Sequence, residues 1–345
     1  MLVWGASVHR NLAALVGVAQ GRYLLPPGAL ALDPSLLAVV LVVLGFGAFW
    51  HWDEVYADPK DTVSGDGYYI RRMAFAKGKP VSKPYCWRPL YPFLARYFGF
   101  RPVSYVCMAG AVCMVYLLAG RGWAGAALAI GFFGNIHIGR FAFRCPDYCD
   151  ALGHFLFLAS LYALLHGSLW IIPMAALCAL TRENLGATVG LLSLFFQPWA
   201  FVAALVAGLI AYYLRREDHE NVHPLVEKTA YETFVRWTKA KKDGVLHWGH
   251  TVQPLRSLPF LVPFGWDRTP PGVHWFLLGF APIFLFAIPA SGQSRMLSYG
   301  YGLCVPFAAV CGLEWLWVAC ILQWFWPVDL QAFDEGGGLN WSSIK

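Results

Sequence analysis

Long apolar runs separated by short polar turns dominate the chain. The first clear run is Leu36 to Trp50, which ends in the aromatic pair Trp50 and Trp52, residues that favour a bilayer interface. Apolar runs of roughly 15 to 20 residues without strand-like alternation are typical of membrane helices, which satisfy their backbone hydrogen bonds internally. We therefore expect helices that cross a bilayer and not the strands of a barrel.

The later runs follow the same pattern. They extend over Val103–Ala119, Trp123–Phe141, Ala151–His166, Leu169–Leu180, Asn184–Leu214, Val273–Ala290 and Tyr299–Phe325. A Gln197-Pro198 break in one of them predicts two half-length helices or one kinked passage. Residues 1–34 are interpreted as an interfacial helix, with a first span as the alternative. The predicted fold is an all-α polytopic membrane protein of about 8–10 transmembrane helices.

Two polar segments interrupt the apolar pattern. Residues 53–102 hold nine Lys/Arg and five acids, whereas the next 112 residues hold only seven charges. We expect 53–102 to be a long first external loop with interfacial helices. Residues 215–268 hold nine Lys/Arg and seven acids and are expected to form a cytoplasmic loop with an amphipathic helix near Leu225–Lys239. Residues 328–345 read as a flexible tail, so the whole chain is one transmembrane domain.

Composition agrees with the pattern. The 345 residues are 58% hydrophobic and 13% charged, which is typical of polytopic membrane proteins. A net charge of +6 raises nucleic acid as a partner, but the basic residues lie in loops and no nucleic-acid motif is present. We expect no nucleic acid, and membrane lipids or phosphates as partners. Among nine cysteines, only Cys86, Cys145 and Cys149 could pair or hold a metal.

Span parity brings four charged clusters to one face of the membrane. They are the first loop, Arg144 to Asp150, the Arg182-Glu183 pair and Arg295. A charge at bilayer depth is costly unless it is paired or functional. This convergence is the main argument from the residues for a functional site.

The stretch Ser64-Gly-Asp-Gly predicts a turn followed by a helix from Asp66 to Lys77 along the membrane surface. Asp66 is either the cap of this helix or a general base, and Arg71 and Arg72 are either lipid-headgroup anchors or phosphate ligands. The next motif, Trp87 to Pro92, suits an extended passage in which the Arg88 fork can hold a phosphate.

Asp147 and Asp150 are three residues apart and would share a helix face at the start of the fourth span. They could hold a divalent cation (Mg or Mn), which prefers oxygen ligands, or cap that helix. Asp53 and Glu54, directly after the first span, form a rival acid pair. No serine-histidine-aspartate arrangement and no phosphate-binding glycine loop is present, so ATP-driven chemistry is not expected.

Three sequence elements in this order resemble the integral-membrane GT-C glycosyltransferases. They are Gly65-Asp66-Gly67-Tyr68-Tyr69, Arg88-Pro89-Leu90-x-Pro92 and Thr181-Arg182-Glu183, followed by Ser294-Arg295 before a last span that contains Tyr and Pro. The class includes the protein O-mannosyltransferases and the aminoarabinose and arabinosyl transferases. The resemblance implies a GT-C-like helical bundle in a bacterial inner membrane or an equivalent membrane, with its active site on the extracytoplasmic face.

The resemblance also implies roles for residues. A polyprenyl-phosphate-linked sugar would be the donor and a lipid, glycan or protein hydroxyl the acceptor, with inversion at the sugar. Asp66 matches the catalytic acid, and Asp53 and Glu54 are its alternatives. The donor phosphate would lie near Arg71, Arg72, Arg88, Arg182 and Arg295. The sugar and acceptor pocket would include Tyr68, Tyr69, Trp87, Glu183 and Tyr299.

Two other classes of function stay open at this point. A transporter or flippase of an anionic lipid-linked substrate would use the same arginines for binding alone, although no internal repeat is visible. A structural subunit of a membrane complex would explain the aromatic content of 17% but not the clustering of charge.

Overall fold

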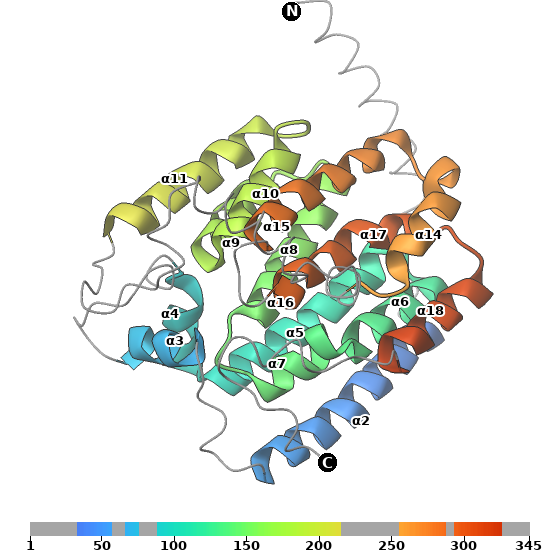
Figure 1. The fold of residues 1–345 in the computed structure, drawn as a ribbon, viewed down its shortest axis with the longest axis horizontal. Coiled ribbons are helices and arrows are strands. Elements are labelled where there is room, and N and C mark those ends of the chain that lie inside the picture. The colour runs from blue at the N-terminus through green and yellow to red at the C-terminus, as the bar shows by residue number, and fades with distance from the viewer. Residues whose placement is uncertain (1–32, 57–65, 76–87, 215–254, 288–292, 326–345) are drawn as a thin grey trace, which may run out of the picture.

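The computed structural model describes residues 33–56, 66–75, 88–214, 255–287 and 293–325 (Figure 1). Throughout these ranges the regular elements are helices and no strand occurs, which confirms the predicted all-α class. The elements are α2 (Pro34–Tyr56), α3 (Asp66–Phe75), α4 (Leu90–Phe98), α5 (Phe100–Leu118), α6 (Gly122–Gly134), the π-helix η3 (Ile136–Arg140), α7 (Phe141–Arg144), α8 (Asp150–Leu165), α9 (Ile171–Thr181), α10 (Glu183–Ser193), α11 (Pro198–Leu214), α14 (Leu258–Gly265), the 3₁₀ helices η4 (Trp266–Arg268) and η5 (Pro271–Gly279), α15 (Phe280–Ala287), α16 (Gln293–Ser298), α17 (Gly300–Ala308) and α18 (Leu313–Phe325).

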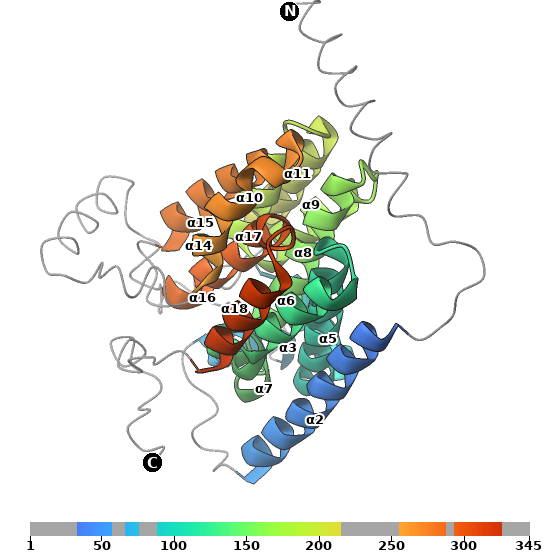
Figure 2. The same cartoon turned by 90° about the vertical axis from the view of Figure 1, so that its right-hand side faces the viewer.

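Helix α8 lies in the middle of the bundle and packs on α5, α9, α10 and α17. Its core positions are apolar, and Leu156, Phe157 and Leu161 are buried among the neighbouring helices. One group of helices, α2, α5, α6 and α18, lies on one side of it, and α9, α10, α11 and α15 lie on the other (Figure 2). The first turn of α8 begins with Asp150, whose partners come from the junction of α9 and α10 and from α16.

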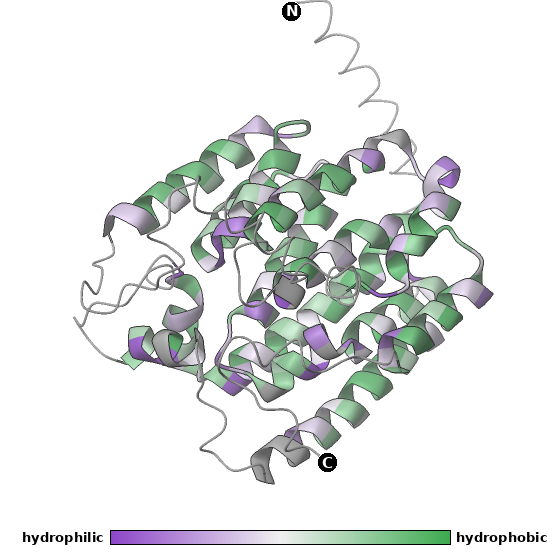
Figure 3. Ribbon diagram, in the orientation of Figure 1, coloured by the Kyte–Doolittle hydropathy of each residue, from purple (hydrophilic) through white to green (hydrophobic). Residues whose placement is uncertain are grey.

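Two helical segments, Pro34–His51 and Phe100–Leu118, are long and apolar enough to cross a membrane. Gly122–Gly134 with His137–Phe143 adds a third if this pair, bent by 53°, counts as one span. Most residues of α2 and α11 are hydrophobic (Figure 3), and several of them, such as Leu41, Leu44 and Leu205, are exposed on the outside of the bundle. Within the described ranges, the protein thus has two or three helices of membrane length, fewer than the sequence pattern predicts, because the other apolar runs form shorter helices.

Two of the predicted spans are interrupted. Trp123–Phe141 bends after Gly134, where the Asn135 side chain accepts a hydrogen bond from the backbone N–H of His137 and begins the π-helical turn η3. Tyr299–Phe325 also divides, into α17 and α18, with Pro306 in the last turn of α17. The predicted break at Gln197-Pro198 is confirmed, since α10 ends at Ser193 and α11 begins at Pro198.

The predicted extended passage at Trp87 to Pro92 is wrong for its described part. Helix α4 begins at Leu90, and Pro89 before it already has helical backbone angles (φ −75°, ψ −23°). The first N–H groups of a helix have no partner within the helix, so prolines are tolerated in its first turn. The motif therefore starts a helix instead of continuing an extended loop.

The described residues on either side of 215–254 lie at one end of the bundle. Gly186 packs on Ala179 and Gly190 on Phe201, so α9, α10 and α11 run back and forth and α11 ends at the same end of the bundle as Arg182. Leu255 lies against Gly300, also at this end. The cytoplasmic location of the second polar segment stays a prediction.

Part of this segment also belongs to the bundle. Leu255, Arg256 and Leu258 are buried, and α14 packs on α17, because the apolar Leu258–Gly265 run continues the hydrophobic pattern. The predicted amphipathic helix at Leu225–Lys239, residues 1–32 and the tail at 328–345 lie outside the described residues.

Candidate functional site

Arg182 lies at the tip of a helical hairpin. Helices α9 and α10 meet there, and the Arg182 backbone between them is extended (φ −162°, ψ 135°). The helices approach closely because Gly186 has no Cβ, and one built there would lie 2.7 Å from the Cα of Ala179. Each helix has 11 residues, hence a length of about 16 Å, roughly half of a bilayer's hydrocarbon core. Arg182 is 1% exposed, so its guanidinium needs partners inside the bundle.

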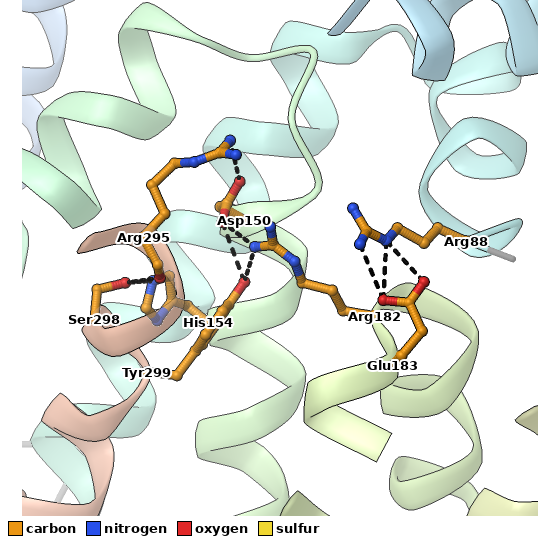
Figure 4. Close-up of polar contacts among 8 residues, drawn as sticks. All are labelled: Arg88, Asp150, His154, Arg182, Glu183, Arg295, Ser298 and Tyr299. Atoms are coloured by element: carbon orange, nitrogen blue, oxygen red, sulfur yellow. Dashed lines mark hydrogen bonds and ion pairs between the residues drawn. The ribbon is translucent and has the colours of Figure 1, made fainter. Parts of the chain in front are cut away.

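Asp150, the first residue of α8, is the main partner (Figure 4). Arg182 donates from Nη1 to Asp150 Oδ1, and Arg295 donates from Nη1 to Oδ2 at 3.4 Å. The Tyr299 hydroxyl accepts from Arg182 at 3.1 Å and donates to Asp150 Oδ1 at 3.3 Å. Gly153 makes room for it, because a Cβ there would lie 2.5 Å from the Tyr299 hydroxyl. One buried carboxylate thus binds two arginines from distant segments.

Glu183 holds a third arginine beside this group (Figure 4). Arg88 donates from Nε to Oε1 and from Nη2 to Oε2, each at 3.0 Å, which is the bidentate geometry of a strong ion pair. Burial by itself lowers the pKa of Arg88, but the charge of Glu183, with smaller contributions, outweighs it, so the pKa is raised above its usual value. Arg88, two residues before the start of α4, is therefore fixed on the tip of the α9–α10 hairpin.

Helix α3 covers the same region from the first polar loop. Arg71 forms an ion pair with Asp147 at 2.7 Å, and a Cβ on Gly67 would lie 3.2 Å from that of Asp147. Burial raises the pKa of Asp147, and the hydrogen bond and charge of Arg71 offset this effect only in part. The start of α3, where Asp66 lies, is therefore next to the turn that leads to Asp150.

His154 packs on Tyr299 and also contacts Ser298, the residue before Tyr299. His154 lies one turn after Asp150 on α8, and its ring packs on that of Tyr299 with centroids 4.3 Å apart. The Ser298 hydroxyl donates to the Arg295 carbonyl at 2.6 Å, so the 3.1 Å contact with His154 Nε2 uses the histidine proton. These contacts connect α8 to α16. Arg295 also lies 4.5 Å from the centre of the Tyr148 ring, as in a cation–π contact.

The structure thus brings together most of the described residues that the sequence places in the site. Arg88, Arg182, Arg295, Glu183 and Tyr299 converge with Asp150, and Arg71 pairs with Asp147 nearby, which agrees with the face expected from span parity. Arg72 is partly buried on α3. The side chains of Asp66, Tyr68, Tyr69, Asp53 and Glu54 and the whole of Trp87 lie outside the described part of the chain.

The backbone nevertheless separates the two acid candidates. Asp53 and Glu54 lie in the last turns of α2, which packs on α6 and α7. Asp66 instead precedes Gly67, which contacts Asp147. Of the two positions, Asp66 is therefore the one whose helix covers the arginine cluster.

The metal prediction gains no support from the described side chains. Asp150 begins α8, but Asp147 lies in the preceding turn, so the two do not share a helix face as expected. Both carboxylates pair with arginines. No group of three or more His, Cys, Asp or Glu that could hold a metal ion is present among the residues described. Cys145 and Cys149 are buried beside this turn, and Cys86 lies outside the described ranges.

Asn184 is a site residue that the sequence does not indicate. It follows Glu183 and is 0% exposed, and neither atom of its side-chain amide has a hydrogen-bond partner in the described part of the protein. A buried amide without partners is costly and marks a position where a ligand could bind. The sequence does not indicate His154 or Ser298 as site residues either, because only the fold brings α16 onto α8.

Comparison of the chain with protein-family models, with curated proteins and with solved structures finds no match. The chemistry of the site therefore has to be argued from its own geometry. Three guanidinium groups, those of Arg88, Arg182 and Arg295, face the two carboxylates of Asp150 and Glu183 among the described side chains. An arrangement with an excess of buried arginine is suited to an anionic ligand such as a phosphate.

Proposed function

We propose that the protein is a multi-pass membrane glycosyltransferase that moves a sugar from a polyprenyl-phosphate donor to an acceptor hydroxyl. The observation that carries the proposal is the sharing of Asp150 by Arg182 and Arg295, beside an Arg88–Glu183 pair and beneath the helix that begins with Asp66. Asp66, Arg88, Arg182, Glu183 and Arg295 carry the resemblance to GT-C glycosyltransferases, and they come from four separate segments of the chain.

The proposed step is a direct displacement. The acceptor hydroxyl loses its proton to the Asp66 carboxylate while its oxygen bonds to the anomeric carbon of the sugar. The bond from that carbon to the phosphate oxygen breaks, and the polyprenyl phosphate leaves with the bonding electrons. Fixed guanidinium groups stabilise the charge that develops on the leaving phosphate. Attack from the face opposite the leaving group inverts the anomeric centre.

Arg182 supports this step because one of its N–H groups is not engaged within the described ranges. The Nε of Arg182 has no hydrogen-bond partner in the described ranges, and the Arg295–Asp150 contact is long at 3.4 Å. A phosphate entering the cluster gains donors without first breaking the Arg182–Asp150 pair. Asn184 is placed beside Glu183 to bind sugar hydroxyls through its amide, which has both a donor and an acceptor.

A membrane context fits this assignment. With α9 and α10 each about half as long as a bilayer core is thick, their hairpin would hold Arg182 near the middle of the membrane when its outer ends lie at the interface. A lipid tail could then lie between helices while its phosphate reaches the arginines. The other short apolar helices would each cross part of the membrane and, two by two, complete the multi-pass bundle.

Transfer of radiolabelled sugar from a panel of polyprenyl-phosphate sugars by the purified protein tests the proposal. Wild type is expected to transfer sugar from at least one donor, and Asp66→Asn is expected to lose at least about a hundredfold in rate. Asp53→Asn is the matched control, expected to keep activity, because α2 packs away from the cluster. Full activity in Asp66→Asn would remove Asp66 as the base.

A transporter or flippase of a lipid-linked anion is the second candidate. The specific observation in its favour is the pair of half-length helices that meet at Arg182, since discontinuous helices are common at transporter binding sites. The donor panel separates the two. Movement of intact lipid-linked sugar across a vesicle membrane, with no transfer from any donor, would support the transporter and reject the transferase.

A further inference from the structure

A second buried arginine site lies apart from the candidate site. Arg256 lies two residues before the start of α14 and is 1% exposed, with its backbone in the left-handed region (φ 51°). Its Nη1 donates to the Leu322 carbonyl in the last turn of α18 at 3.1 Å. Its Nε has no hydrogen-bond partner in the described ranges, and the four ion pairs found there involve other arginines.

The surroundings of Arg256 are polar but carry no acid among the described side chains. Gln323, next to Leu322, donates to the Leu255 carbonyl at 3.1 Å and accepts from the Asn135 amide at 2.7 Å. His137 lies close enough for its ring to interact electrostatically with the Arg256 guanidinium. Burial lowers the pKa of Arg256 to about 10, so it remains protonated at neutral pH.

This polar group is separate from the Asp150 cluster. The hydrogen bonds described above for Arg256 and for Asp150 share no residue. The Phe132 ring packs on His154, with centroids 5.4 Å apart, and on Tyr301, with centroids 5.1 Å apart. Arg256 lies at the same end of the bundle as the candidate site, since Leu255 contacts Gly300 just after α16. A ligand bound at Arg256 would therefore share this end of the protein with the proposed donor but bind different residues.

A helix-capping role is the simplest alternative. An arginine near the C-terminus of a helix is favourable because it binds free carbonyls there. However, capping does not require the charge to be buried, and a buried charge without a counter-ion is expensive. An anionic ligand would supply the missing counter-ion and engage the Nε.

We infer that Arg256, with Asn135, His137 and Gln323 around it, forms a second anion site that binds a phosphate group. Phosphate matches the planar fork of arginine, which can offer two parallel N–H donors. The phosphate is either that of a lipid headgroup or free in solution. The inference does not depend on sugar transfer, because it concerns binding at a different place in the fold.

Thermal unfolding of the full-length protein in detergent tests it, with inorganic phosphate in one arm and short-chain phosphatidic acid in the other. One or both ligands are expected to stabilise wild type, since a ligand that binds only the folded state raises its stability. Stabilisation by phosphatidic acid alone identifies a lipid headgroup, and stabilisation by inorganic phosphate identifies a site open to the free ion. Absence of any effect from both ligands overturns the inference without reference to a variant.

Two variants locate the effect. Arg256→Gln is expected to weaken binding about tenfold or more, the loss typical of one charged hydrogen bond. Arg268→Gln is the matched control, because Arg268 is exposed at the other end of the same α14–η4 unit and also contacts a carbonyl, that of Val310. Equal binding by Arg256→Gln and wild type overturns the assignment.

Stability without ligand separates the site from a cap. A ligand site predicts that Arg256→Gln unfolds no more easily than wild type when no phosphate is present, because a buried unpaired charge has been removed. A purely structural cap predicts earlier unfolding. If Arg256→Gln does not fold, Arg256→Lys keeps the charge but lacks the fork, and it is expected to bind more weakly than wild type. If wild type transfers no sugar from any donor but still binds phosphate at Arg256, the proposed function is refuted and the second anion site is not.

Discussion

Arg182 and Asp150 form an ion pair inside the helix bundle, although 32 residues separate them in the chain. This one contact ties the tip of the α9–α10 hairpin to the first turn of α8. Both residues are nearly inaccessible, at 1% and 4% exposure, so neither can exchange its partner for water. The stability of the bundle and the chemistry of the site are consequently coupled through the same carboxylate.

Removal of the Asp150 charge should therefore be costly. Asp150→Asn leaves the Arg182 and Arg295 guanidiniums without their shared carboxylate, and such broken buried pairs typically lose about 3–5 kcal/mol. The combination of Asp150→Asn with Arg182→Met should cost less than the sum of the two single changes. Denaturant unfolding of the four proteins gives this coupling, and additive effects would show that the pair contributes no net interaction.

The α9–α10 hairpin should not tolerate a methyl group at its closest approach. Gly186→Ala forces contact with Ala179 and is expected to lose about 1–3 kcal/mol of unfolding free energy. Gly208→Ala is the control, because nothing lies within 4 Å of a Cβ at that position of α11. It should be neutral or stabilising by up to about 1 kcal/mol. Similar losses at both glycines would contradict the packing described.

Gly153 should control the hydrogen bonds of Tyr299. Tyr299→Phe alone is expected to lose about 1 kcal/mol, the usual net value of a buried hydrogen bond. Gly153→Ala pushes the Tyr299 hydroxyl away from Asp150, so Tyr299→Phe should cost less on that background. The unfolding free energies of the two single variants and the double variant test this, and equal costs on both backgrounds would refute the role of Gly153.

Glu183 and Arg88 should affect donor use in opposite directions if the proposed function holds. Glu183 occupies the fork of Arg88 in this structure. Glu183→Gln frees that fork for phosphate and is expected to lower the donor KM by roughly threefold to tenfold, whereas Arg88→Gln should raise it by at least about tenfold. Initial rates over a donor concentration series give both values. A rise in KM for both variants would show that the pair acts as a unit in binding.

Asp147 should give the stability of the protein a dependence on pH. Its folded-state pKa is raised, mainly by burial, so the folded state holds this proton more tightly than the unfolded state. The stabilisation is complete below the unfolded pKa and is lost as pH rises through the folded pKa. Asp147→Asn carries no such proton. Wild type should therefore lose stability relative to Asp147→Asn as the pH rises above about 4, the usual pKa of an aspartate, as thermal unfolding can show. A constant difference would contradict the raised pKa.

Much of the site could be predicted from the sequence because charges are rare outside the two polar segments. When an apolar stretch of more than a hundred residues carries so few charges, each of them needs a partner, and the parity of the runs places Arg182, Arg295 and Asp150 at one end. The helix at Asp66 followed from its turn and its spacing, and α3 confirms it from Asp66 to Phe75.

Other features depend on tertiary contacts that no local pattern contains. The bend at Asn135 arises from a side chain that accepts a backbone N–H, and a central Asn in an apolar run does not reveal this. In the sequence, half-length helices cannot be distinguished from short membrane spans. The contact of Gly186 with Ala179 identifies α9 and α10 as the two arms of a hairpin. The side of the membrane predicted for the second polar segment depends on the same point, since the number of passages before it changes with whether α9 and α10 form one crossing or two.

The sharing of Asp150 also sets an order of assembly during synthesis. Arg182 follows Asp150 by 32 residues, whereas Arg295 follows it by 145. The hairpin can pair with α8 soon after it leaves the ribosome, and that early pair shields one buried charge from lipid. Arg295 arrives only when α16 has been made, 145 residues after Asp150. A nascent chain stopped before α16 would therefore hold the Arg182–Asp150 pair but lack the second arginine of the site.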